Sequence, residues 1–536
     1  MSLGRQSPRL VLLLCALAAL AFAFQATSAK FTVSGIVVEH ATGRPLGGVL
    51  VILSPTSARD RRLTILTGAD GRFAFTNLPA AKYSLLAQRR GEQEVHGYQG
   101  SEGFSTGVVA GPGLPSENLT FPLEAPASIA GTVIDEDGEQ VRQANIVLLR
   151  KAVLLGRNQV SQMGNRVTGA SGRFRFAHLP PGTYFIAVQA QPWYAQFAGP
   201  GAEGAQAAGS RELDVAYPVT YYGDTTNGAA AAPIPLVEGA SITVQIALHA
   251  VPAIHVPILG TESSQGGLSA SASVEGPGGV LLFSNAVTIG ANNSYELTGL
   301  APGRYIVQLS GEGQAGSRQT VELAAGSTLS AQNAVTISVN GRVAFEGMDH
   351  PPNGVTLLLS DGKQSFSARI EQDGSFSFST NAPSPGRYEV YVSNAPEAYI
   401  RTVTAKGAVV SGDTVEIEEG TSVQLSVVAA KGLRSKLDGI AVKDDKPVAA
   451  AMILLLPRDL NRKALIRRDQ SDSDGTFTLP EIVPGRYTLL AIDDGRELAY
   501  QDPEMIKPYL SAGQLIDFPL GNDAPVKVNV VSRLRQ

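Results

Sequence analysis

Short runs in which apolar and polar residues alternate recur along the whole chain. The clearest runs begin with an aromatic residue, as in Phe174-Arg-Phe176. A period of two residues is typical of a β-strand with one buried face. The aromatic residues that begin these runs are Phe73, Phe174, Tyr295, Phe376 and Phe477. The chain is therefore predicted to repeat one β-strand unit.

Each of these runs lies between two turns. A glycine stands two residues before the aromatic in most copies, which is typical of a hairpin turn that needs a positive φ. These glycines are Gly71, Gly172, Gly374 and Gly475, and Asn293 takes the place in the third copy. A Pro-Gly pair follows the run, and we expect a type II turn with positive φ at its glycine. Those glycines are Gly182, Gly303, Gly386 and Gly485, each followed closely by the tyrosine that opens the next strand.

The spacing of the repeats predicts the domain organisation. Strand patterns recur throughout, and a helical turn is expected only within residues 499–511. The prediction is an all-β protein of five tandem Ig-like or transthyretin-like β-sandwich domains after a signal peptide, the third of them divergent. The predicted boundaries are 1–29 for the signal peptide and 30–124, 125–250, 251–334, 335–432 and 433–536 for the domains.

The first 29 residues have the features of a secretory leader. Arg5 and Arg9 precede an apolar stretch over residues 10–24, which is short for a membrane span, and small residues precede Lys30. We expect cleavage near Lys30 and a secreted or periplasmic protein of the outer cell envelope, without a transmembrane segment in the mature chain. An uncleaved anchor is the alternative.

Composition narrows the function classes further. Cys15 is the only cysteine and lies in the leader, so the mature chain would have no disulfide and no thiolate chemistry. The formal net charge is −5 and no basic patch is visible, so nucleic acid is not an expected partner.

The motif elements together resemble a known family. The first copy carries the elements G-x-V, P-L-x-G-x-x-V-x-L and D-G-x-F-x-F-x-x-L, followed by a tyrosine. The residues are Gly35, Pro45, Gly48, Val51, Asp70, Gly71, Phe73, Leu78 and Tyr83, with counterparts Gly131, Gly172, Phe174, Leu179, Pro181, Gly182 and Tyr184. This set resembles the carboxypeptidase regulatory-like domain, related to transthyretin-like, Cna B-type and carbohydrate-binding-like folds. The tandem arrangement is similar to secreted repeat proteins of Acidobacteria. In carboxypeptidases this domain lies beside the catalytic domain and performs no chemistry itself. The resemblance therefore implies a non-catalytic β-sandwich.

No catalytic constellation emerges from the sequence. The six histidines are scattered, and neither H-E-x-x-H nor a G-x-S-x-G elbow occurs. His249 and His255 are the closest pair, and we interpret them as surface histidines rather than metal ligands. We therefore expect no enzyme activity, no catalytic residues, no cofactor and no metal.

One aromatic stretch stands apart from the repeats. Between Gln191 and Asp224 the second domain carries a long insertion with a Gly/Ala-rich middle. Its aromatic residues offer flat faces for sugar rings or anchors for a protein partner. The candidate ligand-binding residues are Trp193, Tyr194, Tyr221 and Tyr222. The alternative is that these rings cover the end of the sandwich.

The sequence thus predicts a non-catalytic β-sandwich array for binding, adhesion or scaffolding at the cell envelope. A carbohydrate or a cell-envelope protein is the expected partner. Two alternatives remain open: a carbohydrate-binding accessory of a polysaccharide-degrading system, and a regulatory subunit of a separate hydrolase.

Overall fold

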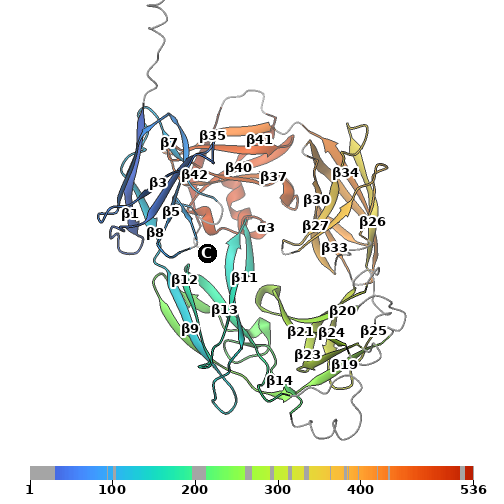
Figure 1. Ribbon diagram of the computed structural model, residues 1–536. Coiled ribbons are helices and arrows are strands. Elements are labelled where there is room, and N and C mark those ends of the chain that lie inside the picture. The colour runs from blue at the N-terminus through green and yellow to red at the C-terminus, as the bar shows by residue number, and fades with distance from the viewer. Residues whose placement is uncertain are drawn as a thin grey trace, which may run out of the picture. The chain divides into compact units, whose positions relative to one another are not determined.

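Strands make up most of the computed structural model (Figure 1). The predicted leader 1–29, the middle of the insertion (196–212) and Asn293 lie outside the described residues. The structure describes residues 30–92, 94–100, 104–195, 213–259, 268–289, 295–311, 317–330, 337–362, 364–378, 383, 385–395, 397–418, 420–432, 435–519 and 525–534. Two compact units are distinguished, residues 1–123 with 472–474 and residues 124–471 with 475–536, and each is described by itself.

The first unit contains one β-sandwich, the first sandwich. One sheet has the order β4-β1-β8, with β1 antiparallel to β4 and parallel to β8. The other has the order β3-β2-β5-β6, and β7 also pairs with β5. Alternate residues of both sheets enclose a common apolar core. The strands are β1 (Phe31–Glu39), β2 (Leu50–Pro55), β3 (Leu63–Leu66), β4 (Arg72–Leu78), β5 (Ala81–Gln88), β6 (His96–Gly97), β7 (Val108–Ala110) and β8 (Leu119–Leu123).

The second unit begins with a sandwich of the same topology, the second sandwich. Its sheets have the orders β12-β9-β17 and β11-β10-β13-β15, and β16 also pairs with β13. The elements are β9 (Ala127–Ile134), β10 (Asn145–Leu154), β11 (Arg157–Val167), β12 (Arg173–Leu179), β13 (Gly182–Gln189), β14 (Val215–Ala216), β15 (Thr220–Tyr221), η1 (Gly228–Ala230), β16 (Ile234–Leu236) and β17 (Ser241–Ala247).

The following segment, called the third here, departs from the two-sheet plan. Strand β21 pairs with both β20 and β22, so the strands form one seven-stranded sheet. Because strands from both halves share one apolar cluster, this sheet must fold over on itself. The elements are β18 (Val251–Pro252), which pairs with β14, β19 (Ile254–Leu259), β20 (Leu268–Glu275), η2 (Pro277–Gly279), β21 (Leu281–Ile289), β22 (Tyr295–Leu300), β23 (Gly303–Gly311), β24 (Ser317–Leu323) and β25 (Leu329–Ser330).

The fourth sandwich returns to two sheets. Their orders are β29-β26-β34-β31 and β28-β27-β30-β33-β32, so β31 and β32 are both edge strands. The strands are β26 (Ser338–Glu346), β27 (Thr356–Ser360), β28 (Ser365–Arg369), β29 (Ser375–Ser377), β30 (Gly386–Ser393), β31 (Ala398–Lys406), β32 (Val409–Ser411), β33 (Thr414–Ile417) and β34 (Ser422–Lys431).

In the fifth sandwich, one strand joins the two sheets. Strand β42 pairs with both β35 and β40, which gives one eight-stranded sheet in the order β36-β35-β42-β40-β37-β38 with β39 and β41 at its side. The elements are β35 (Ser435–Lys443), β36 (Lys446–Pro447), β37 (Met452–Pro457), η4 (Lys463–Leu465), β38 (Arg467–Gln470), β39 (Thr476–Ile482), β40 (Gly485–Asp493), η5 (Gly495–Glu497), α3 (Pro503–Ile506), η6 (Lys507–Ala512), β41 (Gln514–Phe518) and β42 (Val526–Ser532).

The short helical elements explain the continuously apolar strand β37. All six of its residues are buried, because the core lies on one face and the segment from η5 to η6 packs on the other. The helical turn expected within residues 499–511 is confirmed as α3 and the start of η6. The all-β fold class is likewise confirmed, whereas the exact domain boundaries stay a prediction.

The hairpin glycines have the predicted conformation. Gly71, Gly172, Gly374 and Gly475 have φ values of 73°, 60°, 84° and 80°. The aromatic run after each turn alternates as expected, and in β4 and β12 the buried positions include both phenylalanines. Local turn chemistry and period-two burial therefore describe this half of the unit correctly.

The predicted type II turn at the Pro-Gly pairs is wrong. Gly182, Gly303 and Gly386 have φ values of 154°, 158° and 154°, far from the value of about 80° that a type II turn needs, and each begins a strand. The positive φ occurs earlier, just before the leucine or isoleucine that ends the aromatic run. A β-bulge lies there, with two residues opposite one on the partner strand. The left-handed residues are Asn77 (62°), His178 (56°), Gly299 (68°) and Glu481 (55°).

Two side-chain hydroxyls complete the repeat. In four copies the tyrosine hydroxyl donates to the backbone carbonyl four residues earlier: Tyr83 to Pro79, Tyr184 to Pro180, Tyr305 to Ala301 and Tyr487 to Val483, at 2.9, 2.7, 2.7 and 2.9 Å. A buried Thr or Ser before the hairpin also bridges two backbone groups in the segment just before β2, β10 or β37. These residues are Thr67, Thr168 and Ser471. Sequence reasoning had not assigned either role.

Candidate functional site

The structure divides the four predicted ligand-binding aromatics between surface and interior. Trp193 follows β13 and is 78% exposed. Its ring meets that of Tyr194 edge to face, with 5.7 Å between the ring centroids. By contrast, Tyr221 is 1% exposed and packs with Val147 and other residues of the second sandwich against Leu282 of the third segment. Tyr222 is half-buried against the core of the second sandwich. Their role in ligand binding stays a prediction.

The aromatic pair of exposed Trp193 and half-buried Tyr194 lies beside an acidic turn. The Tyr194 hydroxyl donates to a Glu136 carboxylate oxygen at 3.3 Å. Burial raises the pKa of Tyr194 above its ordinary value, and the charge of Glu136 and its neighbours raises it further. Asp135 is used inside the turn, where its carboxylate accepts from the backbone N–H groups of Asp137 and Glu139. The site therefore combines a free aromatic face with hydrogen-bond acceptors of negative charge.

The histidine pair is not brought together. His249 is exposed, whereas His255 on β19 lies between two carboxylates. Its Nε2 is 2.8 Å from an Asp214 oxygen and its Nδ1 is 3.3 Å from Glu296. The carboxylates flank opposite ring nitrogens, so they cannot share one ion with the histidine. Within the described part of the chain, no group of three or more His, Cys, Asp or Glu side chains is placed to hold a metal ion.

A second polar cluster joins distant parts of the second unit. Arg157, at the start of β11, places Nη2 2.5 Å from both carboxylate oxygens of Glu389 on β30. The Tyr391 hydroxyl also donates to Glu389, and Lys463 lies 3.6 Å from it. The Arg157 Nε donates to Gln501 at 2.6 Å. The β10–β11 hairpin thus connects the second sandwich with the fourth and fifth, and these charges stabilise structure.

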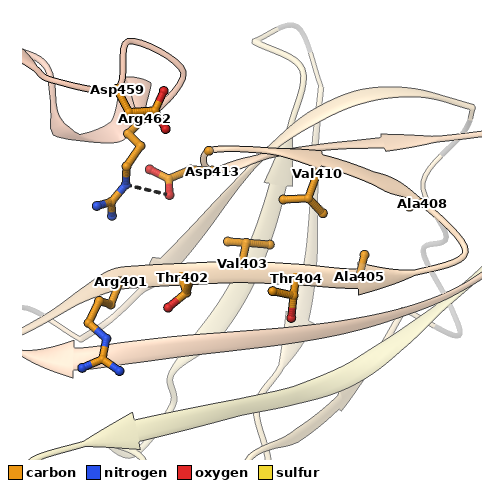
Figure 2. Close-up of a pocket in the computed structure, with 11 residues that line it drawn as sticks. Arg401, Thr402, Val403, Thr404, Ala405, Ala408, Val410, Asp413, Asp459 and Arg462 are labelled. Atoms are coloured by element: carbon orange, nitrogen blue, oxygen red, sulfur yellow. Dashed lines mark hydrogen bonds and ion pairs between the residues drawn. The ribbon is translucent and has the colours of Figure 1, made fainter.

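A hollow of about 480 Å³ lies beside the fourth sandwich (Figure 2). It is lined by the edge strands β31 and β32, by the turn that carries Asp413, and by the loop from Asp459 to Arg462 of the fifth sandwich. Sequence reasoning missed it. Asp413 and Arg462, which lie at one end of the hollow, are 49 positions apart along the chain, and no sequence motif connects them.

Comparison with known protein families finds one matching family model. The model of the carboxypeptidase regulatory-like domain matches residues 32–121 and again 128–206. No curated protein matches the chain. Among the described residues, none of the helices has both the length and the apolar character needed to cross a membrane.

Several pilins are among the similar solved structures. GBS52, the minor pilin of Streptococcus agalactiae, is 14% identical with a TM-score of 0.23, over 41% of this chain and 96% of that chain. A streptococcal ancillary pilin is 12% identical with a TM-score of 0.18, over 56% and 98%. The shaft pilin SpaA from Lactobacillus rhamnosus GG is 10% identical with a TM-score of 0.19, over 42% and 98%. Likenesses this distant carry no conclusion about how this chain works.

The sheets and the repeated hairpin define a multidomain all-β protein built on one sandwich plan. The model of the carboxypeptidase regulatory-like domain matches the first sandwich over residues 32–121 and much of the second over residues 128–206. This confirms the family that the motif residues of the first two copies suggested.

Proposed function

We propose that this chain is a non-catalytic, secreted or periplasmic array that binds carbohydrate at the cell envelope. The observation that carries the proposal is the exposed indole of Trp193 beside the half-buried ring of Tyr194. The Trp193 indole is 78% exposed, and contact between its apolar surface and water is unfavourable. Covering the ring with a flat apolar surface would therefore lower the free energy.

The neighbouring carboxylate favours a sugar over a purely apolar ligand. One face of a pyranose ring is apolar enough to stack on Trp193, while its hydroxyls are donors. Glu136 offers acceptors at the edge of the same surface, where it already accepts from Tyr194. A stack with hydroxyl donation to a carboxylate is thus available without a change in the fold. A cell-envelope protein that inserts a side chain at this surface is the alternative ligand.

Glycan-array binding of the chain from Lys30 to Gln536 tests the proposal. Trp193→Ala should weaken binding at least about tenfold, because an aromatic anchor at the centre of a contact carries much of its free energy. Leu515→Ala is the matched control, since Leu515 is 83% exposed but has no role in the site. Glu136→Gln should weaken binding less than Trp193→Ala.

Two results would contradict the proposal. If Trp193→Ala binds glycans as the unchanged chain does, the aromatic pair is not the contact. If the chain binds no glycan but retains an envelope protein in a Trp193-dependent manner, the ligand class is wrong and the surface is an adhesion site.

A further inference from the structure

The hollow beside the fourth sandwich has the form of a groove along two open sheet edges. Strand β31 pairs with β34 on one side only, and β32 ends the other sheet. In Figure 2, Val403 and Ala405 point from β31 toward Val410 across the groove, whereas Thr402 and Thr404 point the opposite way. The groove therefore has an apolar floor and an unpaired strand edge beside it.

One end of this groove holds a buried carboxylate. Asp413 is 2% exposed, and its Oδ2 has no hydrogen-bond partner among the described residues. Its Oδ1 lies 3.4 Å from Nε of Arg462, a long contact shown by the dashed line in Figure 2. A buried carboxylate oxygen without a donor is costly, so this atom is available to a donor that a ligand brings.

The nearby cations do not supply that donor. Arg462 directs Nη2 to the carbonyl of Ile400, 2.5 Å away, and so fastens the loop of the fifth sandwich to β31. Arg401 is paired with Glu346 outside the groove. Asp459 adds a second carboxylate to the lining. Burial raises the pKa of Asp413, and Arg462 only partly opposes this. The end of the groove therefore favours a further positive charge.

We propose that this groove binds an extended peptide, which adds to the edge of β31 and places a lysine ammonium against Asp413. Main-chain hydrogen bonds to an open strand edge hold a peptide without regard to sequence, and side-chain pockets select it. Alternate residues of the peptide would rest on Val403 and Val410. Lysine is favoured over arginine because a single free oxygen cannot accept the two parallel hydrogen bonds that give a guanidinium its advantage, whereas an ammonium needs only one acceptor.

Two capped seven-residue peptides serve as probes for calorimetric titration of the full chain. In both, threonine and valine alternate around a central residue, which is lysine in one and the uncharged norleucine in the other. The lysine peptide should bind at least about tenfold more tightly, as a charge-assisted hydrogen bond to a buried acceptor requires. Its binding should also slow amide exchange in β31 (Ala398–Lys406).

Variants assign the selectivity to one carboxylate. Asp413→Asn should remove the preference for lysine while the norleucine peptide binds as before. Asp517→Asn is the matched control, because that carboxylate is 81% exposed and lies elsewhere in the fifth sandwich. Ala408→Arg, which fills the groove and adds a like charge, should abolish binding of both peptides without changing Asp413. The exchange pattern of each free variant checks that its fold is kept.

The proposal is overturned if both peptides bind equally well to the unchanged chain, or if neither binds. It is also overturned if the protected amides lie outside β31, or if Asp413→Asn keeps the full preference for lysine.

Discussion

Three glycines of the second sandwich separate backbone strain from crowding. Gly172, in the repeated hairpin, has a φ of +60°, and a Cβ built on it would lie 2.6 Å from the carbonyl oxygen of Val133. Gly138 has a φ of +80° but open space around it. Gly169 also has open space, and its φ lies outside the left-handed range. Alanine at Gly172 should therefore cause both backbone strain and crowding, and alanine at Gly138 should cause backbone strain alone. Alanine at Gly169 should cause neither.

The magnitudes follow from the geometry. An alanine in the left-handed region costs about 1 kcal/mol or slightly more relative to glycine. Carbon–oxygen contacts are normally no shorter than about 3.3 Å, so at Gly172 the backbone of β9 must move by about 0.7 Å. That movement disturbs the bond from Val133 N–H to the Gly172 carbonyl, 2.9 Å long, and should cost about 1–2 kcal/mol more. We expect a loss of about 2–3 kcal/mol for Gly172→Ala, about 1 kcal/mol for Gly138→Ala, and less than about 0.5 kcal/mol for Gly169→Ala.

Amide hydrogen exchange in the full chain is the suitable assay, because a multidomain chain need not unfold in one transition, and a single melting curve would then mix its domains. The free energy of opening is read from the slowest amides of β9 and β12. Equal losses for Gly172→Ala and Gly138→Ala would show that the close approach to Val133 has no energetic weight. A harmless Gly172→Ala would refute the assignment of this hairpin altogether.

Two further changes test other features of the fold. Tyr487→Phe removes the donor to the Val483 carbonyl and should lower the opening free energy of β40 amides by about 1–2 kcal/mol. Tyr194→Phe, which alters an exposed hydroxyl, should leave that free energy unchanged. Equal effects of the two variants would contradict a stabilising role for the Tyr487 hydrogen bond. Asp413 holds its proton more tightly in the folded chain, so its contribution is fully present below about pH 4 and is lost as pH rises through the raised pKa. Asp413→Asn should accordingly gain stability relative to the unchanged chain as pH rises above about 4, read from the opening free energy of the slowest β33 amides. A pH-independent difference would show that burial does not perturb this carboxyl.

Local patterns predicted those parts of the fold that local chemistry determines. The alternation of apolar and polar residues predicted the strands. Gly172 and its counterparts predicted the hairpins, because the preference for a positive φ depends mainly on the residue itself. The Pro-Gly pair misled because tertiary structure decides between alternative turns. His178 and Glu481 adopt the left-handed conformation at a bulge that no local preference of these residues predicts, and the bonded tyrosine hydroxyl fixes the chain beside it.

The candidate sites could be predicted only where they lie within one stretch of sequence. Trp193 and Tyr194 are neighbours, so an unusual aromatic stretch was sufficient to select them. Composition could not separate them from Tyr221, whose burial depends on packing against Leu282 more than 60 residues later. The groove at Asp413 was invisible for a related reason, because strand edges become recognisable only when sheet order is known.

The repeat itself suggests how one sandwich plan acquires different contacts. In the first sandwich β2 and β3 have six and four residues, whereas their counterparts β10 and β11 have ten and eleven. The added residues extend the hairpin beyond the core and carry Arg157 to Glu389 and Gln501. Since the extension leaves the buried alternation and the hydroxyl bonds intact, it changes which domains touch without a cost to the core. Elongated hairpins and insertions, rather than core positions, are therefore where differences in partner and ligand can arise in such an array.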